Sequence, residues 1–157
     1  GLTLPPEREG TGMDRTDYQI LNILQKDCRT TLKHIGDQVG LTAPAVSERV
    51  RRMEEKGVIR GFRIDVERER LDCSMTGFIF VAVEPEKYNT FCEFCEKSSA
   101  IVSHYHVIGV FNALLRFAVR GTRELDELLS SIKRYGDSQT SVELKTYFET
   151  KEIPPLG

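Results

Sequence analysis

Guanidinium, hydroxyl and carboxylate groups gather in the six residues from Ser47 to Arg52, SERVRR. An arginine can pair with the edge of a guanine or with a phosphate, and a serine hydroxyl can reach either group. These residue types therefore point to contacts with duplex DNA. The alternative is a solvated helix face, on which Arg51 and Arg52 pair with Glu48 and Glu55 at helical spacing.

Two short helices are expected before these arginines. Asp14 can cap a helix whose apolar residues recur at helical spacing and which ends near Asp27. A second helix is expected to begin at Thr30 or Thr31 and to end at Gly40. Its inward residues are expected to be Leu32, Ile35 and Val39.

The arginines themselves fall on a third helix, with Thr42 as its N-cap and Gly57 after its end. On a helical projection its apolar side consists of Val46, Val50 and Met53. The opposite side consists of Pro44, Ser47, Glu48, Arg51 and Arg52. Three helices with a glycine-containing turn before the third are typical of a helix-turn-helix, whose third helix enters the major groove.

The DNA contacts are expected to come from this third helix and the segment after it. Base contacts are assigned to Ser47, Glu48 and Arg51, with Pro44 on the same face. Phosphate contacts are assigned to Arg49, Arg52 and Arg60. The stretch from Val58 to Val66 is expected to be extended, as a small wing of paired strands or a linker.

Beyond Cys73 the apolar pattern predicts the order strand, helix, strand, strand, helix, strand. The expected segments are 77–84, 86–99, 101–109, 113–120, 122–134 and 140–149. This order is that of a ferredoxin-like fold, in which two helices cover one face of a four-stranded sheet. The predicted fold class is therefore α+β, with an N-terminal (winged) helix-turn-helix domain and a C-terminal ferredoxin-like βαββαβ domain.

The first of these strands is apolar on both faces, because Phe78 and Phe80 alternate with Ile79 and Val81. Two helices can cover only one face of the sheet. The other face is expected to be buried against a second copy of the chain. We therefore expect an obligate homodimer, with assembly into an octamer or another higher oligomer.

Charge is distributed unevenly between the two halves of the chain. The net charge of −2 argues against a nucleic-acid partner, but residues 13–64 hold ten Lys/Arg against seven Asp/Glu, and residues 65–157 hold eleven against fifteen. The expected domains are a helix-turn-helix domain with a linker strand over 13–64, a linker over 65–76 and an effector-binding and oligomerisation domain over 77–157. Residues 1–12 are interpreted as a tag remnant or disordered extension.

Two other groups of side chains could do chemistry. Cys92 and Cys95 form a C-x-x-C, but they share an amphipathic helix and have no second pair nearby, so packing is favoured over a metal or redox site. His104 and His106 alternate on one strand without a third ligand in the sequence, which favours sheet packing or the dimer interface. No catalytic constellation, metal site or cofactor motif stands out. The lack of a long apolar run or secretory signal, and the few unevenly spaced cysteines, favour the cytoplasm.

Taken together, these features resemble the Lrp/AsnC family of leucine-responsive, or feast/famine, transcription regulators. The resemblance is carried by MDRTDYQIL from Met13, LTAPAVSERVRRMEEKGVI from Leu41, HVIGVFNALLRFAVRG from His106 and QTSVEL from Gln139. It spans Met13 to about Pro154. It implies an N-terminal DNA-binding domain, a linker strand and a C-terminal amino-acid-sensing domain that dimerises through its sheet, with dimers assembling further.

The resemblance also places an effector site near the turn between the second and third strands. The residues that it assigns are Gly109, Val110, Phe111 and Asn112, with Thr140 and Ser141 on the last strand. The family usually has an aspartate where this sequence has Asn112, and a carboxylate is the natural partner of an ammonium group. The effector is therefore left open between an amino acid, another small metabolite and none.

The predicted function is sequence-specific DNA binding that regulates transcription in response to a small metabolite, on a roughly palindromic operator. No enzymatic activity and no cofactor are expected. One alternative is a metabolite sensor whose DNA binding is vestigial. Another is an enzyme similar to sirohaem decarboxylases, which share this two-domain organisation but carry a proline- and tryptophan-rich insertion, whereas this chain has no Trp.

Overall fold

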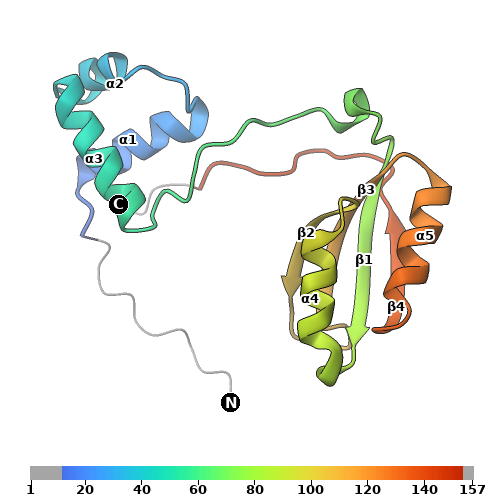
Figure 1. Cartoon of the computed structure of the whole chain (residues 1–157). Helices are drawn as coiled ribbons and strands as arrows, with labels where there is room; N and C mark the ends of the chain where they lie inside the picture. Colours follow the sequence, from blue (N-terminus) through green and yellow to red (C-terminus); the bar gives the residue numbers. More distant parts are fainter. Residues whose placement is uncertain (1–11, 154–157) are drawn as a thin grey trace. The chain divides into compact units, whose positions relative to one another are not determined.

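The computed structural model describes residues 12–153, and these form two compact units (Figure 1). The helical unit contains the residues up to Ile64 together with the segment from Phe148, and the sheet unit contains Asp65–Tyr147. The segment from Phe148 thus groups with the helices and not with the sheet. The expectation for residues 1–12 lies outside the described residues, apart from Gly12.

The helical unit contains the three predicted helices. Their bounds are α1 Arg15–Lys26, α2 Leu32–Val39 and α3 Ala43–Glu55. Each begins after a side chain that accepts a main-chain N–H of the first turn, and these N-caps are Asp14, Thr31 and Thr42. The predicted helix starts are confirmed.

The turn between α2 and α3 depends on two glycines. Gly40 ends α2 with a φ of 73°, a left-handed conformation that favours glycine. Gly36 lies one turn earlier, where an added Cβ would meet the Leu41 carbonyl oxygen at 2.3 Å. The chain can therefore fold back closely over α2 and enter α3, as a helix-turn-helix requires.

The core of the helical unit is small and comes from all three helices. Its fully buried members are Ile20, Ile35, Val46 and Met53. Leu32 was expected to point inward, and this is wrong, since it is 40% exposed. It lies one turn before Ile35, at the very start of α2, beyond the edge of the core.

Of the two predictions for the segment after α3, a wing of paired strands or a linker, the paired strands are wrong for this chain. No strand forms between Gly57 and Arg68, a stretch that the structure describes throughout. The N–H groups of Val58 and Ile59 instead donate to the Met53 carbonyl, at 2.9 and 3.1 Å. The start of the segment is thereby folded onto the end of α3, and a short 3₁₀ helix, η1 (Arg68–Leu71), precedes the sheet unit.

The sheet unit is the expected ferredoxin-like arrangement. Its elements are β1 Met75–Val83, η2 Pro85–Lys87, α4 Tyr88–Lys97, β2 Ile101–His106, β3 Ala113–Val119, α5 Thr122–Ile132 and β4 Gly136–Val142. The strands lie in the order β2-β3-β1-β4, and every neighbouring pair is antiparallel. Both α4 and α5 cover the same face (Figure 1), where they bury Ile79 and Val81 of β1 beneath Phe91 and Leu128.

The last strand differs most from its prediction, which was 140–149. β4 pairs with β1 from Gly136 opposite Val83 to Val142 opposite Gly77. Its sequence GDSQTSV is mostly polar, because β4 is an edge strand and edge strands tolerate polar residues. The apolar pattern that guided the prediction therefore starts too late along the chain.

The sheet face away from α4 and α5 carries large apolar side chains that the described chain leaves partly exposed. Phe78 is 36% exposed and Tyr105 is 57% exposed. Phe80 lies beside them in the register, opposite Leu114 of β3, and its ring centroid is 5.9 Å from that of Phe111. We call this surface, made of Phe78, Phe80, Tyr105 and Leu114, the open face.

Candidate DNA-binding helix and effector-binding turn

The side chains of α3 that are proposed for DNA contact share its solvent face, with one exception. Those that are exposed are Pro44, Ser47, Glu48, Arg51 and Arg52. Arg60, beyond the helix, is exposed as well. On the opposite side of the helix, Val46 and Met53 are buried in the core. This packing fixes which face of α3 points to solvent.

Arg51 is held by two glutamates of its own helix. Its Nε and Nη2 donate to Glu48 at 3.0 and 2.6 Å, and its Nη1 contacts Glu55. These hydrogen bonds raise the pKa of Arg51 and lower the pKa of Glu48. All three side chains are more than half exposed, and exposed ion pairs are weak, so a phosphate or base can displace them.

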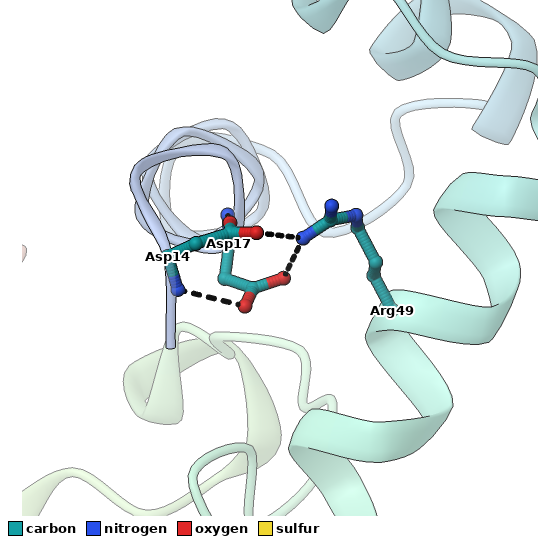
Figure 2. Close-up of polar contacts among 3 residues, drawn as sticks. All are labelled: Asp14, Asp17 and Arg49. Carbon is teal, nitrogen blue, oxygen red and sulfur yellow. Dashed lines mark hydrogen bonds and ion pairs between the residues drawn. The ribbon is translucent and has the colours of Figure 1, made fainter. Parts of the chain in front are cut away.

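Arg49 is the exception. Figure 2 shows its guanidinium turned away from the solvent face of α3 toward the start of α1, where Nη1 lies 2.7 Å from Asp14 and 2.8 Å from Asp17. Asp14 and Asp17 also exchange hydrogen bonds between side chain and main chain, as a capping box. The bond from Arg49 holds the pKa of Asp14 below its ordinary value.

Arg49 thus joins α3 to the start of α1 within the helical unit. The Asp17 side chain is only 10% exposed, so its charge needs this partner. The sequence contained a signal that the phosphate assignment did not use, since Arg49 is three residues after Val46 and four before Met53, on the buried side. The structure therefore places Arg49 away from the face that the other DNA-contact candidates share.

The proposed effector turn is built around Asn112. Its side-chain Nδ2 donates to the Val83 carbonyl at 2.9 Å, and its Oδ1 accepts the Val83 N–H at 2.8 Å. Its main-chain N–H donates to the Val81 carbonyl at 3.1 Å, and its carbonyl accepts the Val107 N–H at 3.0 Å. Asn112 therefore extends the pairing of β3 with β1 and closes the turn.

The remaining residues of the proposed effector site are dispersed. Gly109 and Val110 are exposed at the tip of the turn, whereas Phe111 is half-buried against Phe80. Thr140 and Ser141 lie on β4, opposite Ile79 and Phe78, on the other side of β1 from the turn. The turn meets β1 at Val81 and Val83, about 7–17 Å further along the strand. One chain therefore does not bring the two halves of the site together.

The cysteine candidates lie on α4, and the histidine candidates lie on β2 close to the start of that helix. The Tyr88 hydroxyl is 3.4 Å from His104 Nε2, and the Tyr88 ring lies 4.5 Å from that of His106. Burial, and then the neighbouring His106, lower the pKa of His104. Burial raises the pKa of Cys95 to about 12, which makes it an unreactive core thiol. Among residues 12–153 no three His, Cys, Asp or Glu side chains are placed to hold a metal ion.

Both units match known protein families. Residues 13–60 match the family described as winged helix-turn-helix DNA-binding, and residues 76–153 match the Lrp/AsnC ligand binding domain. The HTH-type transcriptional regulator FL11 of Pyrococcus horikoshii is 32% identical over 145 residues, which cover 90% of this chain and 96% of the relative. The chain belongs to the Lrp/AsnC family. LrpB of Bacillus subtilis is 29% identical over 133 residues, covering 85% and 89% of the two chains.

Solved structures of this family share the fold. A transcriptional regulator from Neisseria meningitidis, solved as a complex with L-Met, superposes with a TM-score of 0.83 at 22% identity, over 90% of this chain and 96% of its own. AsnC of Escherichia coli superposes with a TM-score of 0.80 at 22% identity, over 91% of this chain and 99% of its own. This Lrp/AsnC chain is thus a DNA-binding transcriptional regulator with a ligand-binding domain. None of the helices in the described part of the chain is long and apolar enough to cross a bilayer.

Proposed function

We propose that this regulator reads a specific operator through the exposed face of α3. Ser47, Glu48 and Arg51 contact base edges, with Pro44 beside them, and Arg52 and Arg60 contact phosphates. The observation that carries this proposal is that these side chains are exposed on one face while Val46 and Met53 anchor the other. Arg49 is left out of the proposed phosphate contacts, because Asp14 and Asp17 already hold its charge.

The operator is expected to be roughly palindromic, because we propose that the chain acts as a dimer. The open face supports this, since a contiguous apolar sheet surface is normally buried in a soluble protein. An isologous dimer presents two copies of α3, which read two half-sites one or more helical turns apart. Dimers are proposed to assemble further, into an octamer or another higher oligomer.

The effector is proposed to be an amino acid or a related small metabolite, bound near the turn that Asn112 closes. The neisserial relative solved with L-Met makes methionine a first candidate to test. Gly109, Val110 and Phe111 are proposed to contact the ligand, and Thr140 and Ser141 are proposed to come from a second chain. Asn112 positions the turn, since its amide is bonded to Val83.

The chain is proposed to have no enzymatic activity and no cofactor, and to act in the cytoplasm. The named relatives are transcriptional regulators, which supports this choice over a sirohaem-decarboxylase-like enzyme. Adding haem to the purified protein tests the alternative. A shift of the Soret band would support a tetrapyrrole site and contradict the proposal.

The DNA-binding proposal is tested by fluorescence anisotropy with a labelled duplex from upstream of the gene and a scrambled duplex of the same composition. Each duplex is titrated at two salt concentrations, because phosphate contacts weaken with salt and base contacts do so less. We expect a preference for the upstream duplex that persists at the higher salt. Equal, weak binding to both duplexes that disappears with salt would favour a metabolite sensor with vestigial DNA binding.

A further inference from the structure

The last described residues of the chain form a strap that begins on the sheet unit and ends on the helical unit. Glu143, directly after β4, donates its N–H to the Thr76 carbonyl at 2.8 Å and pairs with Arg116 at 3.2 Å. From Phe148 onward the chain groups with the helices. We use the name strap for residues 143–153, which contain no helix or strand (red end of the colour bar in Figure 1).

The far end of the strap is bound by a single side chain, Gln25, near the end of α1. Its Nε2 donates to the Ile153 carbonyl at 3.1 Å, and its Oε1 accepts the Ile153 N–H at 2.9 Å. The side-chain amide thus satisfies both main-chain groups of one residue, as a neighbouring strand would. The two residues are 128 positions apart in the sequence, so this contact joins the last described residues to the first helix.

The side-chain chemistry at position 25 is specific for this contact. A glutamate could accept the Ile153 N–H but could not donate to its carbonyl, and an alanine could do neither. Thr150, Lys151 and Glu152 line a groove with Gln25, so the strap approaches α1 over several residues. Lys151 also places its ammonium 4.4 Å from the ring centre of Phe148, which folds this end of the strap on itself.

We propose that the strap is a second, reversible tether by which the ligand-binding domain restrains the DNA-binding domain, with Gln25 as its clasp. The first tether is the covalent linker that follows Ile64. Both hydrogen bonds of the clasp are solvent-exposed, and such bonds contribute little net stability, so the clasp can open without unfolding either unit. The eleven residues of the strap span at most about 35 Å, so a closed clasp limits where the DNA-binding domain can move.

The consequence for DNA rests on the proposed function. In a dimer, binding at one half-site raises the effective concentration of the second α3 at the other half-site, and a tighter tether raises it further. Opening the clasp should therefore weaken binding to a duplex with two half-sites. Binding to a single half-site should not change, because the exposed face of α3 is untouched.

Docking of the strap is tested by hydrogen–deuterium exchange of the full chain, read by mass spectrometry in peptides that cover residues 148–153. The variants are Gln25→Ala and Gln25→Glu, and the matched control is Gln19→Ala, an exposed glutamine on the same helix. We expect both Gln25 variants to speed exchange in the strap by about threefold or more, and the control to match the parent. Equal exchange in all four proteins would overturn the docking.

Coupling to DNA is tested by anisotropy with one-site and two-site duplexes. We expect Gln25→Ala to weaken two-site binding by about three- to tenfold and to leave one-site binding unchanged. Faster exchange with an unchanged ratio of the two affinities would overturn the tether. Failure of the parent protein to prefer its operator would instead overturn the proposed function and the coupling that rests on it, while the exchange experiment would still decide whether the strap docks.

Discussion

Asn112→Asp is expected to destabilise the sheet unit, although the two side chains have nearly the same shape. In the parent, the amide donates to the Val83 carbonyl and accepts the Val83 N–H. A carboxylate retains the second bond, but it has no hydrogen for the carbonyl and places an oxygen against an oxygen. The substitution therefore removes one of the two side-chain bonds that hold the turn against β1.

The size of the effect follows from the half-buried position of Asn112. A buried acceptor left without its donor costs about 1–3 kcal/mol, and a stronger charge-assisted bond to the Val83 N–H offsets part of the added repulsion. We therefore expect a loss of about 2 kcal/mol in the free energy of unfolding. For a unit of this size that corresponds to a melting temperature lower by about 8–16 °C.

The penalty of Asn112→Asp should also depend on pH. A protonated carboxyl can donate to the Val83 carbonyl as the amide does, so folding favours the protonated form and raises the pKa of the introduced group above its unfolded value of about 4. Stability that depends on the protonated form is present below the unfolded pKa and is lost as the pH rises through the folded pKa. The variant should therefore approach the parent near about pH 4 and differ most above about pH 7.

Urea denaturation followed by circular dichroism at several pH values measures both effects. Asn89→Asp, on the exposed side of α4, is the matched control for an added charge, and Asn112→Ala removes both bonds without adding a titratable group. The alanine variant should lose stability to the same extent at every pH. If Asn112→Asp were as stable as Asn89→Asp at neutral pH, the amide of Asn112 would not be held by Val83.

Three further predictions concern the helical unit and the open face. Arg49→Ala should lower the unfolding free energy of the helical unit by about 1–3 kcal/mol at neutral pH, because Asp17 loses its partner; since Arg49 lowers the pKa of Asp14, the loss should shrink as the pH falls from about 4 through that lowered pKa, and a pH-independent loss in urea titrations would contradict it. Arg51→Ala should weaken operator binding by about 1–3 kcal/mol and relax base preference, whereas Arg60→Ala should weaken binding to all sequences evenly; normal operator affinity in anisotropy would remove Arg51 from the site. Leu114→Lys on the open face should lower the mass of the assembly toward that of one chain in light scattering at micromolar concentration, while Ser130→Lys on the exposed side of α5 should not; a monomeric parent would refute the dimer.

The helix-turn-helix was predictable because local chemistry specifies it. Asp14, Thr31 and Thr42 cap the three helices as their types and positions indicated, and Gly40 ends α2. The pairing of Arg49 with Asp14 and Asp17 could not be predicted, because these partners lie more than thirty residues away, on a helix whose orientation the local sequence does not set. A pattern of apolar residues finds the buried side of a helix, but it does not say which charge on that side has a partner.

The sheet unit shows the same division between local and long-range information. The strands that carry two apolar faces or a regular alternation were located well, whereas β4 was placed too late because an edge strand needs few apolar residues. The role of Asn112 as a closing residue could not be found from its neighbours. It depends on Val83, which lies 29 positions earlier and is brought alongside only when β1 and β3 pair.

The separation of the turn from Thr140 and Ser141 has a thermodynamic consequence for the proposed regulation. If one ligand contacts residues from two chains, the assembled form binds it more tightly than the isolated chain does. Linkage then requires that the ligand favour assembly by the same factor by which assembly raises ligand affinity. A second chain also brings a second α3, so the same equilibrium sets how many half-sites are held at once. The effector therefore needs no direct path to α3, because changing how many copies of the helix act together is sufficient to change operator occupancy.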